Sequence, residues 1–189
     1  MVDGTSDEEL MASMMSGDRQ ALTILVERHY GSLLGYLFRL AGGSRTLAED
    51  LVQETFATIL RRGGYEVTRP FKPWLYAVAT NVARDHFKSA AVRREAPTEH
   101  DAIVEMRDDD PGPEEHALAA EEGREVAQAV ARLGDEYRET ILLRFYQGLS
   151  LREIAAALDV PVGTVKSRLS TGTRRLRELL ARSREGANT

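Results

Sequence analysis

The chain of 189 residues contains no cysteine. Without thiols it can form no disulfide, no cysteine-ligated zinc site and no cysteine nucleophile, which suits a reducing compartment such as the cytoplasm. No stretch approaches the roughly 18 consecutive apolar residues that identify a membrane span. The first ten residues are acidic rather than a basic stretch before an apolar run, so we expect no secretory signal. These absences predict a cytoplasmic protein without membrane insertion.

Motifs of catalysis are also missing. The four histidines show no metal-ligand spacing, no glycine-rich phosphate loop precedes a helix, and the sequence has no nucleophile elbow. We therefore expect no enzyme activity, no catalytic or metal-binding residues, and no cofactor.

Charge is present in quantity but is unevenly distributed. The net charge of -5 argues at first against nucleic acid, because binding to phosphates needs Lys and Arg. Residues 99–122, however, hold ten acidic residues and one basic residue, whereas residues 163–184 hold seven basic residues and one acidic residue. Such asymmetry is typical of an acidic tether and a basic working surface.

Helix start and stop signals divide the N-terminal half. Ser6 and Glu9 have the spacing of a capping box, Asp18 can cap the next helix, and Thr46 and Glu49 repeat the capping-box spacing. No alternating strand pattern is bounded by turns, so we expect helices only. The expected helices cover about residues 7–17, 19–41, 46–62 and 73–89.

A change of composition marks the middle of the chain. Residues 96–120 hold three of the six prolines, an Asp run at 108–110 and little apolar periodicity, as in a solvated linker. Helical periodicity then resumes through Val126, Ile141 and Phe145. We predict an all-α protein of two small helical domains, a four-helix bundle over 1–95 and a helix-turn-helix domain over 121–184, joined by an acidic flexible linker over 96–120.

The C-terminal half has the pattern of a helix-turn-helix. Ser150 and Glu153 form a capping-box pair after Gly148, and a turn at 159–161 leads into the last helix. The expected buried stripe of that helix leaves basic and hydroxyl side chains on its other face. A short helix, a tight turn and such a second helix suit the DNA major groove. An ordinary helical hairpin with a solvated basic face is the alternative.

Residues 148–155 and 162–169 resemble region 4 of the extracytoplasmic-function sigma factors. The resemblance implies a domain that reads the minus-35 promoter element and touches the flap of RNA polymerase. Response-regulator output domains carry a similar pattern, so this half alone indicates only DNA binding. The minus-35 contacts that the resemblance implies are Arg152, Thr164, Lys166, Ser167, Arg168, Ser170 and Arg174.

One departure from this family follows the shared motif. Many relatives have Arg-Ala-Arg where this chain has Thr171, Gly172 and Thr173. Glycine inside a helix costs about 1 kcal/mol relative to alanine, which points to local flexibility or to close approach of a neighbouring backbone. Specificity for the minus-35 element can therefore differ at this place.

Residues 48–56 resemble region 2.2, the helix by which sigma factors dock to polymerase. Helical spacing places Ala48, Val52, Phe56 and Ile59 on one apolar stripe. It places Asp50, Gln53 and Glu54 on another face, which in the family binds the clamp helices. An exposed acidic face without a partner would show the same spacing.

Residues 71–85 resemble regions 2.3 and 2.4, which open and recognise the minus-10 element. One face of this helix carries an aromatic ring that can stack on bases, an amide that can bond a base edge, and cations that can hold the backbone. The loop over 69–72 could close a pocket around a flipped base. Core positions are the alternative for Trp74 and Tyr76. The predicted minus-10 contacts are Lys72, Trp74, Asn81, Arg84 and Lys88.

Energy limits what this small domain can do by itself. Opening a duplex costs about 1.4 kcal/mol per base-pair step, whereas stacking a captured base returns about 1 to 3 kcal/mol. Two or three trapped bases can nucleate a bubble but cannot hold a full one open. We therefore expect DNA melting to require polymerase.

Together these resemblances identify the chain as a sigma factor that delivers RNA polymerase to promoters. The expected partners are core polymerase through its clamp helices and flap, promoter DNA as duplex and as non-template single strand, and an anti-sigma factor. The linker either lies in a polymerase channel or is a plain tether. The alternative function is a transcription regulator that binds duplex DNA without joining polymerase.

Overall fold

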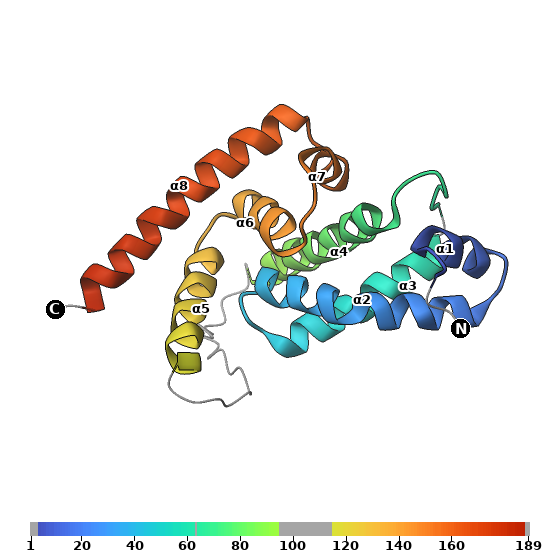
Figure 1. Cartoon of the computed structure of the whole chain (residues 1–189), viewed down its shortest axis with the longest axis horizontal. Helices are drawn as coiled ribbons and strands as arrows, with labels where there is room; N and C mark the ends of the chain where they lie inside the picture. Colours follow the sequence, from blue (N-terminus) through green and yellow to red (C-terminus); the bar gives the residue numbers. More distant parts are fainter. Residues whose placement is uncertain (1–3, 63, 95–114, 188–189) are drawn as a thin grey trace.

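The structure is a computed structural model that describes residues 4–62, 64–94 and 115–187. Within these ranges it contains helices and no strand, so the predicted all-α fold is confirmed (Figure 1). Most of the predicted linker lies outside the described residues. The helices are α1 (Asp7–Met15), α2 (Arg19–Leu40), α3 (Arg45–Arg62), α4 (Phe71–Arg94), α5 (Glu115–Ala131), α6 (Asp135–Ile141), the π-helix η1 (Leu142–Tyr146), α7 (Leu151–Leu158) and α8 (Val162–Ala187).

The first two helices begin at the predicted caps. The backbone N–H of Ser6 donates to Glu9 Oε2 at 2.8 Å, and the N–H of Glu9 donates back to Ser6 Oγ at 3.2 Å. Asp18 Oδ1 accepts from the N–H of Gln20 at 2.8 Å. These bonds satisfy backbone donors that have no partner inside the helix, which is why the two helices begin where they do.

The start of α3 corrects a prediction. The helix begins at Arg45 and not after Thr46, because Ser44 Oγ accepts from the N–H of Leu47 at 3.4 Å. Glu49 closes no capping box here, and its carboxylate pairs instead with Arg45 at 3.0 Å. A hydroxyl residue stands at both 44 and 46, and spacing alone favoured the wrong one.

The long helix α4 begins two residues before Pro73 and continues past Ser89. Its first N–H is held from a distant part of the sequence, since the N–H of Phe71 donates to Glu8 Oε1 of α1 at 2.8 Å. α5 likewise begins at Glu115, so the last six residues of the predicted linker are helical.

The C-terminal helix-turn-helix forms as its sequence predicts. Gly148 has φ +70 after η1, Ser150 and Glu153 form a capping box at the start of α7, and Asp159 ends α7 with φ 52. α8 then begins at Val162. This places α7 and α8 as the two helices of the motif (Figure 1).

The π-helix explains one side chain that periodicity misplaces. η1 carries a hydrogen bond from the N–H of Gln147 to the carbonyl of Leu142, which spans five residues instead of four. The wider turn rotates the following side chains relative to an α-helix. Phe145, expected on the buried side with Ile141, is therefore 65% exposed.

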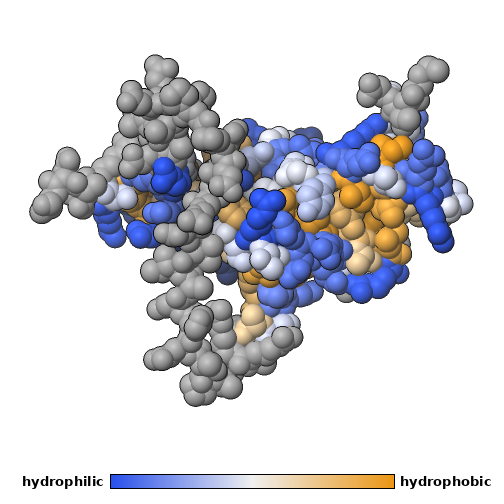
Figure 2. All heavy atoms as spheres, turned by 90° about the horizontal axis from the view of Figure 1, so that it is seen from below, coloured by the Kyte–Doolittle hydropathy of each residue, from blue (hydrophilic) through white to orange (hydrophobic). Residues whose placement is uncertain are grey.

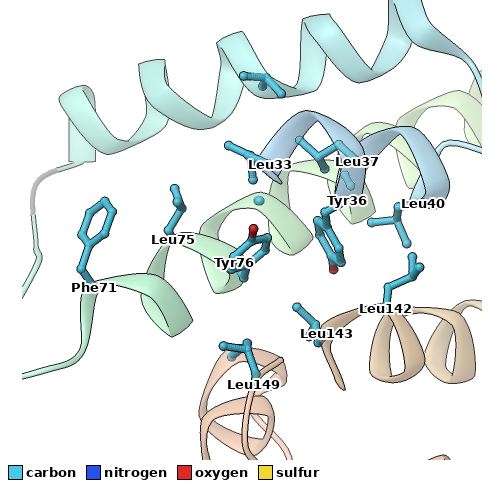
Figure 3. Close-up of a cluster of buried hydrophobic side chains, with 14 of the residues drawn as sticks. Leu33, Tyr36, Leu37, Leu40, Phe71, Leu75, Tyr76, Leu142, Leu143 and Leu149 are labelled. Atoms are coloured by element: carbon cyan, nitrogen blue, oxygen red, sulfur yellow. The ribbon is translucent and has the colours of Figure 1, made fainter. Parts of the chain in front are cut away.

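The two helical units pack directly on each other. We call α1 to α4 the N-terminal bundle and α5 to α8 with η1 the C-terminal bundle. Figure 3 shows side chains from both in one buried cluster. Burying one leucine contributes about 1.5 to 3 kcal/mol, so this shared core favours the packed arrangement. The cluster includes Tyr36, Leu40 and Tyr76 from the first bundle and Leu142, Leu143 and Leu149 from the second.

The surface is mixed in character. Seen from below, hydrophobic residues gather toward the end of the molecule where Figure 1 places α1, α2 and α3, beside hydrophilic patches (Figure 2). Among the described residues of the N-terminal bundle, four large hydrophobic side chains are exposed: Met15, Tyr30, Leu60 and Val67. In the described residues, no helix is long and apolar enough to span a bilayer.

Gly172 lies where α8 crosses α6. A Cβ atom at this position would lie 3.0 Å from Cδ1 of Ile141 and 3.3 Å from Cβ of Tyr137. The glycine in the Thr171 to Thr173 segment therefore leaves room for side chains of α6, rather than for the neighbouring backbone that the sequence analysis named.

We expect Gly172→Val to destabilise the protein by about 1 to 3 kcal/mol, because added methyl groups would overpack this contact. Gly31→Val on α2 is the matched control, since a Cβ there meets nothing within 4 Å. Chemical denaturation measures both variants. Equal denaturation midpoints would contradict the packing role of Gly172.

Candidate nucleic-acid interface

A groove of about 650 Å³ runs between α3 and α4. Its α3 wall includes Asp50 and Glu54, which the sequence assigns to polymerase docking, and its α4 wall includes Trp74 and Asn81, which it assigns to the minus-10 element. Residues assigned to two different functions, and separate in the sequence, thus line one groove. Its lining mixes apolar side chains such as Val78 and Val82 with charged ones such as Arg61 and Asp85.

Trp74, which lines this groove, belongs to a cluster of three aromatic rings. The ring of Trp74 lies 4.9 Å from that of Tyr65 and 5.9 Å from that of Phe71, measured between centroids. Trp74 is half-buried, so part of the indole faces the groove while the rest packs. Tyr65 donates its hydroxyl hydrogen to the carbonyl of Arg69, and burial raises the pKa of this tyrosine. Sequence reasoning missed Tyr65, although it anchors the loop predicted to close a pocket.

The outer face of α3 carries the predicted docking residues. Asp50, Gln53 and Glu54 are all exposed. Leu60 lies seven residues after Gln53, hence on the same side of the helix, and is 54% exposed. An exposed leucine beside acidic and amide groups is a feature that the sequence prediction missed. A large apolar side chain on a helix face that should be polar was the available signal.

The predicted minus-10 side chains of α4 divide into two sets. Asn81 and Lys88 are exposed and meet no residue of the C-terminal bundle through a hydrogen bond in the described structure. Lys72 instead donates from Nζ to the carbonyl of Gln147 at 2.8 Å. Arg84 forms a bidentate ion pair with Glu139 of α6, with Nε 2.8 Å from Oε1. The hydrogen bonds to Glu139 raise the pKa of the Arg84 guanidinium.

Tyr76 belongs to the core, the alternative that the sequence left open for it. Its ring is fully buried and meets the ring of Tyr36 edge to face at 5.2 Å. Its hydroxyl donates to Oε1 of Gln147, and burial raises the pKa of Tyr76, so the phenol keeps its proton.

The solvent face of α8 has the predicted character for DNA. Lys166, Ser167, Ser170 and Arg174 are exposed, Thr164 is half-buried, and Arg152 of α7 is exposed beside them. Lys166, Ser170 and Arg152 are therefore available to phosphates and base edges. Arg174 pairs with Glu178 at 3.0 Å, and Ser167 Oγ donates to the carbonyl of Thr164 at 2.9 Å.

Arg168 differs from these neighbours. Its Nη2 lies 3.1 Å from Oε2 of Glu136 on α6, and its side chain is only 19% exposed. The ring of Tyr137 on the same helix α6 lies under Arg175 at 4.5 Å from the centroid. Arg168 thus faces α6, whereas Lys166 faces solvent.

The capping box of α7 supports the helix that precedes this reading face. The N–H of Ser150 donates to Glu153 Oε2 at 2.7 Å and the N–H of Glu153 donates to Ser150 Oγ at 3.3 Å. Hydrogen bonds from Ser150 hold the pKa of Glu153 below its ordinary value. In the described part of the chain no cluster of three His, Cys, Asp or Glu residues could hold a metal ion.

Family comparisons agree with both halves of this geometry. Residues 25–93 match the model of sigma-70 region 2, which covers the bundle that lines the groove. Residues 123–176 match the model of sigma-70, region 4, which covers the helix-turn-helix.

Characterised proteins match along nearly the whole chain. The ECF RNA polymerase sigma-E factor of Haemophilus influenzae is 32% identical over 89% of this chain and 92% of its own length. The sigma factor BldN of Streptomyces coelicolor is 33% identical over 91% of this chain, which spans 65% of that longer protein. The solved structure of CnrH in complex with the cytosolic domain of CnrY has a TM-score of 0.69 and 28% identity, covering 94% of this chain and 98% of that one.

The helix-turn-helix, the bundle that contains the groove, and the relatives all indicate the same class of protein. This class is the sigma subunits of bacterial RNA polymerase. This chain belongs to the extracytoplasmic-function sigma factors of the sigma-70 family. It is thus a promoter-specificity subunit rather than a regulator that acts apart from polymerase.

The lowered pKa of Glu153 gives a pH prediction. The capping bond stabilises the fold above the ordinary glutamate value of 4.5, and this contribution is lost as the pH falls through the lower folded pKa. Ser150→Ala should cost about 1 kcal/mol at neutral pH, and less in acid. Ser13→Ala, at an exposed helix position, is the control. A Ser150→Ala cost that stays constant from pH 7 to acid would refute this link.

Proposed function

We propose that three surfaces of this sigma factor divide promoter recognition between them. The α3 face docks on the clamp helices of core polymerase, the α3–α4 groove captures bases of the minus-10 element, and α8 reads the minus-35 element. The observation that carries this proposal is the groove itself, whose two walls bring predicted docking and base-capturing residues together.

Docking is proposed for Asp50, Gln53, Glu54 and Leu60. Asp50 and Gln53 offer acceptors to basic or polar partner side chains, and Glu54 does so beside Arg61, with which it is ion-paired. The exposed leucine offers an apolar centre for the interface. In the described structure α3 packs on α2 and α4, so this face is not covered by the C-terminal bundle.

Base capture is proposed for Trp74 and Asn81, with Lys72, Arg84 and Lys88 holding the strand. The half-exposed indole can stack on a base, for which about 1 to 3 kcal/mol per base is typical. Asn81, two helical turns beyond Trp74 on the same groove wall, can bond a base edge. Capture of an unpaired base, and not reading of duplex, is the chemistry that this hollow suits.

Minus-35 reading is proposed for Arg152, Thr164, Lys166, Ser167, Ser170 and Arg174. Arg168, predicted from sequence as a contact, is better placed to position α8 on α6 through Glu136. The flap of polymerase is the proposed partner of the same C-terminal domain, as the family resemblance implies.

An anti-sigma factor is a further proposed partner. CnrH, similar over nearly its whole length, is solved bound to the cytosolic domain of CnrY. We propose that this chain acts in the cytoplasm as a non-catalytic initiation factor under control of such a protein. An acidic linker over 96–114 is proposed to join the two domains, which we assign to residues 1–95 and, from the start of α5, 115–184.

Transcription in vitro tests the function as a whole. Core polymerase from the same bacterium is given a pool of its genomic fragments, with and without this protein, and the RNA 5′ ends are sequenced. New start sites that depend on the protein support the function. Identical start sites in both reactions would sink it.

For docking, we expect Asp50→Lys with Glu54→Lys to weaken binding to core polymerase at least tenfold, since reversed charges meet basic partner groups. Glu27→Lys, an exposed acid on α2, is the charge-matched control for one reversal. Surface plasmon resonance with core polymerase measures both. An equal loss in both variants would mean that net charge, not the α3 face, governs docking.

For minus-35 reading, we expect Lys166→Ala to reduce the slope of log affinity against log salt for duplex DNA by about 1, as for one lost phosphate contact. Arg168→Ala should leave the slope unchanged and lower the denaturation midpoint, because its partner is Glu136. Fluorescence anisotropy with a duplex of random sequence measures the slopes. The assignment fails if Arg168→Ala changes the slope as much as Lys166→Ala does.

A further inference from the structure

We propose that the C-terminal bundle inhibits the minus-10 site by occupying the cations that hold the DNA strand. The proposal rests on the function proposed above for Lys72 and Arg84. In the closed arrangement described here, in which the two bundles pack together, Arg84 is ion-paired with Glu139 of α6, and the Nζ of Lys72, an exposed residue, donates to the carbonyl of Gln147 after η1.

Glu139 is built as an anionic partner for Arg84. Glu139 is only 3% exposed, and both of its carboxylate oxygens accept hydrogen bonds from the guanidinium of Arg84. The fork of an arginine binds carboxylates and phosphates in the same bidentate manner. Glu139 therefore takes the place that a backbone phosphate of the strand would take, and Arg84 cannot bind both at once.

Gln147 adds a second set of contacts nearer the start of α4. Its carbonyl accepts from Lys72 Nζ at 2.8 Å, its side-chain oxygen accepts from Tyr76, and its Nε2 donates to the carbonyl of Ser32 at 3.4 Å. One residue, only 8% exposed, thus binds α2 and α4 together. Its three contacts form or break as a set when the bundles meet or part.

The base-reading groups are left free. Asn81 and Lys88 stay exposed and Trp74 stays half-exposed in the closed form. The closed protein therefore keeps its stacking surface but lacks most of its backbone anchors, so it should bind single strands weakly and with little dependence on salt.

The docking face is also left free, which gives the events an order. Asp50, Gln53 and Glu54 are exposed in the closed form. Core polymerase can thus dock before the bundles part, and opening then releases Lys72 and Arg84 for DNA. Inhibition of this kind keeps free protein from binding single strands before it meets polymerase.

Two variants should weaken the contacts of Glu139 and Gln147 with α4, which we call the latch, and so favour separation of the two bundles. Glu139→Gln removes the charge that Arg84 binds, and Gln147→Ala removes two side-chain contacts without changing charge. The control is Glu136→Gln, which lies on the same helix, changes charge by the same amount, and pairs with Arg168 inside the C-terminal bundle.

The probe is a fluorescein-labelled oligothymidylate, because backbone contacts do not depend on base sequence. We expect both opening variants to raise its affinity about fivefold or more, within the usual range of coupling between sites. The slope against log salt should steepen by about 0.7 for each phosphate contact regained. Small-angle scattering of the full chain should show a larger radius of gyration for both, and Glu136→Gln should match wild type.

The latch is overturned if Glu139→Gln and Gln147→Ala bind the probe as wild type does, or if Glu136→Gln gains as much. Should Glu139→Gln unfold below the assay temperature, Gln147→Ala alone decides. A larger radius of gyration without tighter binding of the oligothymidylate also overturns the proposal, since Lys72 and Arg84 would then be released without binding the strand. Failure of the proposed function would appear separately, as start sites that do not depend on the protein.

Discussion

The packing of η1 against α2, together with that of α7 against α4, is the contact on which the arrangement of this protein depends. Leu142, Leu143 and Leu149 complete a core that begins with Tyr36 and Tyr76. Gln147, directly after the π-helix, is a polar partner for the buried hydroxyl of Tyr76 on α4 and for the carbonyl of Ser32 on α2. An unpaired hydroxyl or amide at that depth would cost roughly 1 to 3 kcal/mol, so the fit must be complete or absent. This favours two discrete states, closed and open, over a continuum.

The closed state accounts for several features that look unrelated. A π-helix is rare and is tolerated where a register shift serves packing or function. Here it turns Phe145 outward and brings Gln147 to α4. A nearly buried glutamate is unusual unless paired, and Glu139 is paired with a residue from the other bundle. The π-helix and the buried glutamate would each destabilise an isolated domain, but each makes favourable contacts where the two bundles pack together.

The sequence predicted the helices and their boundaries better than the packing of the helices on one another. Caps at Ser6, Asp18 and Ser150 were predictable because a capping residue and its partner lie within three or four positions. Local chemistry could not choose between Ser44 and Thr46, where two hydroxyl residues compete for one helix start.

The missed features depend on contacts between distant positions. Periodicity placed Phe145 on the buried side because it assumes a uniform helix, and one wide turn breaks that assumption. Spacing placed Arg84 correctly on the face of α4 with Asn81, but no local pattern reveals that Glu139, 55 positions later, binds it. The sequence predicted two helical domains joined by a linker, but it did not predict that the domains pack on each other. Their packing is a property of surfaces that only the folded chain displays.

The central claim is that promoter binding requires the two bundles to separate. Because the chain has no cysteine, Thr23→Cys on α2 and Ala181→Cys on α8, both at exposed positions, give a specifically labelled pair for energy transfer. Transfer between the two dyes should be high in the free protein and should fall when core polymerase and promoter DNA are added together. Transfer that stays unchanged in the initiating complex would contradict the claim.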